Sequence, residues 1–136
     1  MKRALSEEEG SVIPEYVMVL TVLIFVLLAL IQFVFAIHVR SILVDSAAEG
    51  ARRAALMKST DAEGIALTEQ LVSSALVDNY ASNVAIEHVN LDGLAAVRVT
   101  ISAPLPLIGL IGPGSQLTVS AHAVEEAQFL TQGRTP

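Results

Sequence analysis

The sequence predicts an α+β fold: a long N-terminal transmembrane helix that continues into an amphipathic helix, then a second helix, then a three-stranded antiparallel sheet. Three observations support this fold. Residues 16–37 carry no charge. Helical spacing of apolar residues follows between residues 39 and 80. Three segments of alternating apolar and polar residues come last, and this alternation is typical of half-buried strands.

The uncharged run YVMVLTVLIFVLLALIQFVFAI is long enough to cross a membrane. As a helix, its 22 residues would span about 33 Å, and the hydrocarbon core is about 30 Å thick. A buried core helix is disfavoured because so small a remainder could not cover a helix that is apolar on every face. A cleaved secretory signal is also disfavoured, because its apolar region would have only about 7–15 residues. We therefore expect one membrane span.

Composition excludes several classes of function. The chain of 136 residues has no cysteine, so neither disulfides nor thiolate metal sites can form. Its net charge of -6 argues against a nucleic-acid partner, because phosphate binding needs a basic face. The three histidines, His38, His88 and His122, lack metal-ligand spacing, and no nucleophile or phosphate-loop motif occurs. We expect no enzyme activity, cofactor, metal or small-molecule substrate.

The stretch EEEGSVIPEY places a helix breaker and a carboxylate directly before the span. In a helix running from the N-terminus, the ring of Pro14 would clash with the Gly10 carbonyl, at a cost of roughly 3 kcal/mol. If the helix begins at Ser11 instead, Pro14 falls in the first turn, where its missing N–H costs little. Glu15 then lies where the helix dipole favours an anion. The local sequence predicts a helix start at Ser11.

This junction resembles the class III signal of type IV pilins and pseudopilins, in which a polar leader ends in glycine and a glutamate follows at the fifth position. The pair Glu15-Tyr16 resembles the variant of Flp (Tad, tight adherence) pili. HVRSILVDSAAEGARRAAL, residues 38–56, is similar to the region after the span in TadE-type pseudopilins. APLPLIGLIGPGSQLTVSAHAVEE, residues 103–126, resembles the closing strands of that family. Pro14 is not part of the motif.

The resemblance implies cleavage by prepilin peptidase between Gly10 and Ser11, with Glu15 and Tyr16 in peptidase recognition and subunit pairing. The free amine created at Ser11 would pair, on a neighbouring subunit, with Glu15. A charge inside a bilayer needs such a partner, because it costs around 2.5–3.5 kcal/mol at the centre and less near the interface. The alternative is a carboxylate that faces the lipid headgroups and does nothing further.

The resemblance also implies a domain plan. Residues 1–10 would be a cytoplasmic leader, residues 11–58 the transmembrane helix with its extracytoplasmic extension, and residues 59–136 a small α+β head, together a pilin-like lollipop. Charges flanking the span do not orient it, because the positive-inside count is nearly balanced. The family implies a single-pass protein of the cytoplasmic (inner) membrane, with the N-terminus inside and the head outside.

Three functions are considered. The first is a minor pilin-like subunit in Tad/Flp pilus assembly, initiation or regulation. Its partners would be the prepilin peptidase, other pilins or pseudopilins, and the Tad inner-membrane assembly platform. The second is a single-pass membrane protein whose head binds an envelope partner without entering a fibre. The third, a membrane-anchored enzyme, has no site that can be named.

Beyond the span, apolar residues repeat along one helical face up to Lys58, so we expect the membrane helix to continue. Within that face, Ala47, Ala51 and Ala55 form a ladder of small residues that would let another element approach closely. Two partners for this helix-packing face remain open: another subunit, or the head of the same chain.

The head is expected to begin with STDAEG, residues 59–64, where Ser59, Thr60 or Asp61 can cap a helix and Glu63 is the capping-box partner of Thr60.

A helix is expected to follow, over residues 62–80. Strands are predicted at residues 84–89, 96–101 and 117–124, with a turn at NLDG between the first two. The apolar segment 104–114 either docks to a partner or leaflet or folds back to close the head.

Overall fold

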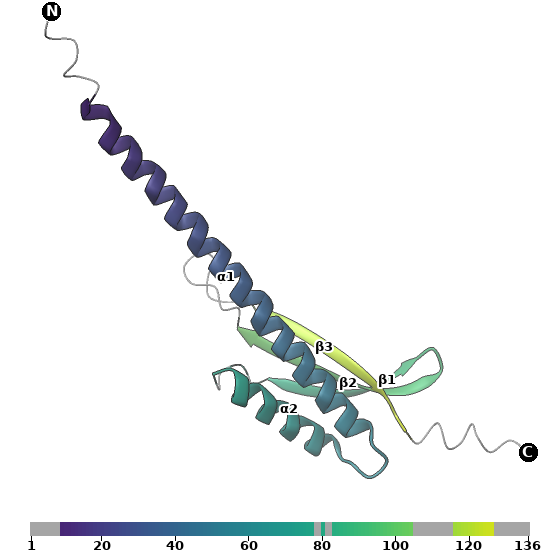
Figure 1. Cartoon of the computed structure of the whole chain (residues 1–136). Helices are drawn as coiled ribbons and strands as arrows, with labels where there is room; N and C mark the ends of the chain where they lie inside the picture. The colour runs from purple at the N-terminus through teal and green to yellow at the C-terminus, as the bar shows by residue number, and fades with distance from the viewer. Residues whose placement is uncertain (1–8, 78–79, 81–82, 105–115, 127–136) are drawn as a thin grey trace, which may run out of the picture. The chain divides into compact units, whose positions relative to one another are not determined.

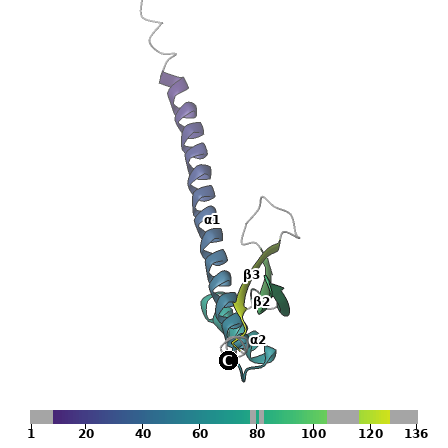
Figure 2. The ribbon, with the colours of Figure 1, turned by 90° about the vertical axis from the view of Figure 1, so that its right-hand side faces the viewer.

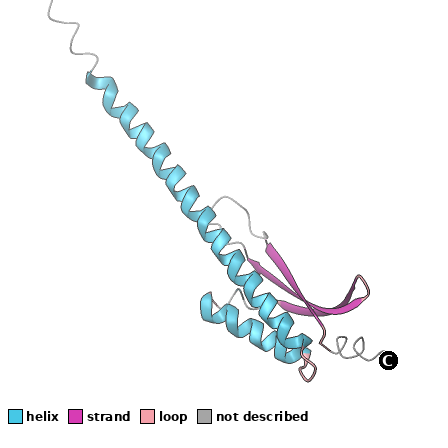
Figure 3. Ribbon diagram, turned by 45° about the vertical axis from the view of Figure 1, so that its right-hand side comes forward, coloured by secondary structure: helices cyan, strands magenta, loops and turns pink. Residues whose placement is uncertain are grey.

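The computed structural model describes residues 9–77, 80, 83–104 and 116–126, and side chains from Ile13 onward. Figures 1 and 3 show their secondary structure. In chain order the elements are α1 (Glu9–Ala55), α2 (Asp61–Ala75), β1 (Val84–Leu91), β2 (Leu94–Pro104) and β3 (Gln116–Val124). The predicted α+β fold is confirmed. The chain divides into two compact units, Met1–Phe35 and Ala36–Pro136, which are described separately.

The first unit contains the apolar part of α1. Between Ile13 and Phe35 the large apolar side chains are exposed, so no described part of the chain covers them. The Thr21 hydroxyl donates to the Val17 carbonyl at 2.7 Å, which satisfies this polar group inside the helix. The described residues contain one helix, Ile13–Ala55, long and apolar enough to cross a membrane. An apolar surface left uncovered all round a helix is suited to contact with lipid.

The ends of α1 differ from the predicted ones. The helix begins at Glu9 and not at Ser11, so Pro14 lies inside the helix. This proline removes the hydrogen bond that residue 14 would donate to the Gly10 carbonyl, and its ring crowds that carbonyl. The helix nevertheless continues through Pro14. At the other end the predicted continuation beyond the span is confirmed, but it stops at Ala55 and not at Lys58.

The second unit contains an antiparallel sheet with the strand order β1-β2-β3. The first two strands meet at Asp92 and Gly93, whose φ angles are 51° and 90°. Two successive residues with positive φ form the type I′ turn that matches the twist of a hairpin. The Gly93 amide donates to the Asn90 side-chain oxygen at 2.8 Å and fixes this turn. The predicted NLDG turn is confirmed, with both strands reaching closer to it than expected.

One face of the sheet packs against the helices (Figure 2). Alternate residues of β2 are buried there, as period-two geometry requires. From α1 this core takes residues spaced four apart along one stripe, and α2 contributes one fully buried valine. Its buried members are Val39, Leu43, Ala47, Ala51, Val72, Val99, Ile101, Ala103 and Val119. The predicted strand alternation therefore identified the correct elements for the core.

The start of α2 follows the predicted capping signal in part. Thr60 is the N-cap, and its side chain accepts from the Glu63 amide at 3.4 Å. The Glu63 carboxylate does not complete a capping box in this structure, because it pairs with Arg53 at 2.9 Å. This ion pair joins the start of α2 to the last turn of α1.

The end of α2 was predicted wrongly. The helix stops at Ala75 and does not reach Tyr80. Leu76 adopts an extended backbone, with φ of -130° and ψ of 173°, while its amide still donates to the Val72 carbonyl. This extended residue turns the chain out of the helix. The apolar segment predicted to dock or fold back lies outside the described residues, apart from Pro104.

Candidate functional site

The residues predicted for processing and pairing all lie in α1. Gly10 and Ser11 are helical, and the structure describes their backbone only. Glu15 and Tyr16 are exposed, Tyr16 to 69%. Their side chains are therefore accessible to a molecule outside this chain.

The alanine ladder is buried within the chain itself. Ala47 and Ala51 are fully buried in the cluster that also contains Val99 and Ile101 of β2. Ala55 is 6% exposed and packs with Val97. Of the two partners considered for these alanines, the partner that contacts them in this structure is the sheet of the same chain. Small side chains at these positions allow α1 to lie close to the strands.

A second stripe of α1 contacts α2, and the sequence reasoning missed it. At the contact, Gly50 of α1 faces Gly64 and Thr68 of α2. A Cβ atom on Gly50 would overlap the Thr68 hydroxyl and lie 2.9 Å from the Gly64 carbonyl oxygen. That hydroxyl is buried and donates to the same Gly64 carbonyl at 2.8 Å. The two helix backbones therefore meet at a pair of glycines.

The sequence contained a partial signal for this contact. Gly50 and Gly64 both lie inside helical stretches, where glycine is unfavourable by about 1 kcal/mol relative to alanine. A helical glycine of this kind often has a packing reason. Which partner it packs against depends on how the two helices cross, and the sequence pattern does not contain that information.

A group of titratable side chains meets at the end of the sheet where α1 ends and α2 begins. His88 of β1 lies between two carboxylates, those of Asp61 and Glu125. The three side chains border a hollow of about 350 Å³ together with the last residues of α1 and the turn that follows it. His88 is 58% exposed, but both of its ring nitrogens have a carboxylate partner.

The alternation of side chains along β1 could have shown from the sequence that His88 faces the helices. Val84, Ile86 and His88 are two residues apart, so they share the sheet face that packs on the helices. His122, by contrast, lies on the opposite face, where its Nε2 accepts from Arg98 Nε at 2.7 Å. The two strand histidines therefore lie in different electrostatic settings, one beside two carboxylates and one beside a guanidinium.

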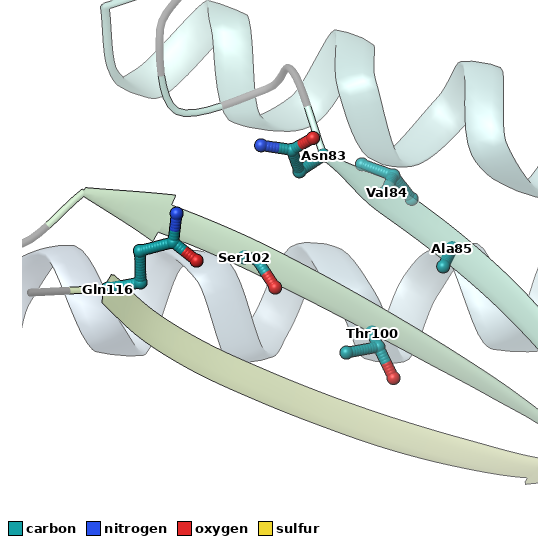
Figure 4. A pocket seen from close by; sticks show the side chains of 6 residues that line it. All are labelled: Asn83, Val84, Ala85, Thr100, Ser102 and Gln116. Carbon is teal, nitrogen blue, oxygen red and sulfur yellow. The ribbon is translucent and has the colours of Figure 1, made fainter. Parts of the chain in front are cut away.

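A second hollow, of about 390 Å³, opens at the other end of the sheet. Figure 4 shows side chains from all three strands around it. The described residues that border it are uncharged amides, hydroxyls and aliphatic groups: Asn83, Val84, Ala85, Thr100, Ser102 and Gln116. Such a lining offers hydrogen bonds but neither a general base nor a charge. Across the described residues, no group of three or more His, Asp and Glu side chains is placed to hold a metal ion.

Comparison with protein families identifies the N-terminal part of the chain. The model described as "TadE-like protein" matches residues 10–52. This segment is TadE-like. The TadE-like segment includes Gly10, Glu15 and Tyr16, two of the three alanines of the ladder, and Gly50. The predicted resemblance to TadE-type proteins is confirmed over these residues.

The TadE-like segment ends before the sheet, so the match leaves α2 and all three strands outside it. Comparisons with curated proteins and with solved structures give no match. The TadE-like segment covers most of the one helix among the described residues that is suited to a membrane span, and that helix makes the chain compatible with a single-pass membrane protein.

Proposed function

We propose that this chain is a minor pilin-like subunit, a pseudopilin, that prepilin peptidase cuts between Gly10 and Ser11 and that acts in Tad pilus assembly, initiation or regulation. The observation that carries the proposal is the position of the family match, which begins at Gly10. Residues 1–9 lie outside the TadE-like segment, as all but the last residue of the discarded leader would. The proposal includes no catalytic role for the chain.

The geometry of α1 supports the cut at this position. In the uncut chain, Pro14 leaves the Gly10 carbonyl without its helical donor. Cleavage after Gly10 removes that carbonyl together with the leader. The new helix then begins at Ser11, and the missing N–H of Pro14 falls in the first turn, where it costs little.

Cleavage also creates a charge that Glu15 can pair with. The Ser11 amine becomes a free cation with an ordinary pKa of about 7.7–8.0. On the same helix, Glu15 is four residues away, about 6 Å along the axis. Its exposed carboxylate can therefore meet the amine of a neighbouring subunit, and we assign it this pairing role. Glu15 and Tyr16 would also be recognised by the peptidase.

The proposal places the chain in the inner membrane, with its N-terminus in the cytoplasm and residues 59–136 outside. Its partners are the prepilin peptidase, other pilins or pseudopilins, and the Tad assembly platform. The uncovered apolar surface of α1 between Ile13 and Phe35 supports the membrane position.

Intact-mass measurement of the chain from membranes of cells with an active prepilin peptidase tests the proposal. We expect a mature chain that begins at Ser11. Replacing Gly10 with leucine should block processing, whereas the matched change Ala4→Leu within the leader should leave it intact. A full-length N-terminus in the unaltered chain would overturn the proposal.

The second candidate is a single-pass membrane protein whose head binds an envelope partner without entering a fibre. The limited extent of the family match supports this second candidate. The match ends at residue 52, so α2 and the whole sheet lie outside the TadE-like segment. The same mass measurement separates the two candidates, since the second predicts an uncut chain.

A further inference from the structure

Three elements that are distant in sequence meet at His88. Its Nδ1 lies 2.8 Å from Glu125 Oε1, directly after β3. Its Nε2 lies 3.1 Å from each carboxylate oxygen of Asp61, the first residue of α2. The imidazole on β1 therefore bridges the start of a helix and the end of another strand.

The protonation state of the ring determines whether both contacts can exist. A neutral imidazole has one N–H donor, and its other nitrogen is an acceptor. Since a carboxylate only accepts, a neutral ring can bond one of the two and must turn a lone pair toward the other. An imidazolium donates from both nitrogens and satisfies both carboxylates with charge-assisted hydrogen bonds.

We propose that His88, Asp61 and Glu125 form a pH-responsive clamp, which closes when the imidazole is protonated and fastens the start of α2 and the segment after β3 to the sheet. A backbone hydrogen bond next to Glu125 connects the same segment to α1. The Glu126 amide donates to the Ala55 carbonyl at 3.2 Å, so the chain just after the clamp also caps the last turn of α1.

The charged groups that face the ring favour its charged form, and the other packed elements present only uncharged groups. On the α2 side it faces Asp61, and on the β3 side Glu125. From β2, the residue directly opposite is Val97, and α1 contributes Ala54 and Ala55 to the same hollow. The other described residues that border the hollow are also uncharged: Leu56, Met57, Ser59 and Thr60. The clamp therefore contains two anions and one group able to become a cation.

The direction of the pH response follows from the same contacts. The hydrogen bond to Glu125, followed by the hydrogen bond and charge of Asp61, raises the pKa of His88 above its ordinary value. A raised folded-state pKa means that the stabilisation is fully present below the unfolded pKa of about 6.5. It is lost as the pH rises through the folded-state pKa. The ring is 58% exposed, so solvent screens the pairs and the effect is modest.

Histidine NMR titration of the full-length chain in detergent micelles tests the clamp. We expect the His88 resonance to titrate above the ordinary value of about 6.5. Asp61→Asn and Glu125→Gln should each lower its midpoint, and the double variant should return it to the ordinary range. A midpoint at or below the ordinary value, or one that the double variant leaves unchanged, would overturn the proposal.

Heat unfolding gives an independent measurement with a matched control. At about pH 5 the His88→Gln variant should unfold a few degrees below the unaltered chain, and at about pH 9 the two should coincide. The other strand histidine supplies the control, because His122→Gln should show no such loss confined to acid pH. A His88→Gln loss of equal size at both pH values would indicate ordinary packing and contradict the clamp. These measurements use the chain alone, so their outcome is separate from that of the processing experiment.

Discussion

Gly50 of α1 and Gly64 of α2 meet backbone to backbone. A Cβ atom on either residue would lie 2.9 Å from the carbonyl oxygen of the other. On Gly64 the same atom would also lie 2.8 Å from the Ala54 methyl. Real Cβ atoms do not approach backbone oxygens this closely, so the crossing of the two helices requires a glycine on each side.

Gly50→Ala should therefore destabilise the second unit. In an open helix this change would stabilise by up to about 1 kcal/mol through helix propensity. Here the added methyl overlaps the buried Thr68 hydroxyl, and overpacking of this kind costs typically 1–3 kcal/mol. We expect a net loss, measured by urea unfolding of the full chain in micelles with circular dichroism. The exposed change Ala66→Ser on α2 is the control, and a Gly50→Ala variant more stable than the unaltered chain would refute the crossing.

Leu43→Ala should be among the most damaging single changes. This side chain is fully buried between α1 and the sheet, and leucine-to-alanine changes in cores cost about 2–5 kcal/mol. Leu27 supplies a matched control on the same helix, because it is 56% exposed and lies in the first unit. Leu27→Ala should leave the urea midpoint of the second unit unchanged, and equal effects of the two changes would contradict the assigned core.

Thr60→Ala should weaken the start of α2. The threonine oxygen accepts from the Glu63 amide, and loss of such an N-cap costs typically about 1 kcal/mol. The adjacent Ser59→Ala change removes a similar hydroxyl that is not the cap. Hydrogen exchange of the first-turn amides of α2 should increase in the Thr60 variant and stay unchanged in the Ser59 variant. The reverse pattern would assign the cap to Ser59.

The proposed pairing role predicts that Glu15→Ala reduces Tad pilus assembly at least about tenfold, because the Ser11 amine of a neighbouring subunit would lose its partner at the membrane boundary. Counting surface pili measures the effect. The nearby exposed change Met18→Ala is the control for altered packing of the span. Normal pilus numbers in the Glu15 variant would remove the pairing role, while the processing experiment would still decide the pseudopilin assignment.

Local sequence was sufficient to predict those helices, strands and turns whose structure depends on residues close together in the chain. The uncharged run predicted the membrane-type helix, and NLDG predicted the hairpin turn. The period-two alternation predicted all three strands. The capping signal predicted a helix start but left Ser59, Thr60 and Asp61 open as the N-cap, which is Thr60. Each of these depends on backbone geometry or side-chain spacing within a few residues. The boundaries were less accurate: α1 begins before Ser11, and α2 ends at Ala75 because Leu76 is extended.

Tertiary structure alone decided which elements meet. The sequence does not show that Gly50 and Gly64 contact each other, since this contact depends on how α1 and α2 pack. His88 lies 27 residues from Asp61 and 37 from Glu125, so only the fold brings the three together. The sequence by itself therefore determined the order and type of the elements and the TadE-like character of residues 10–52. The packing of helices on the sheet decided which strands of the same chain contact the alanine ladder and what surrounds His88, because non-local contacts depend on geometry that no single segment contains.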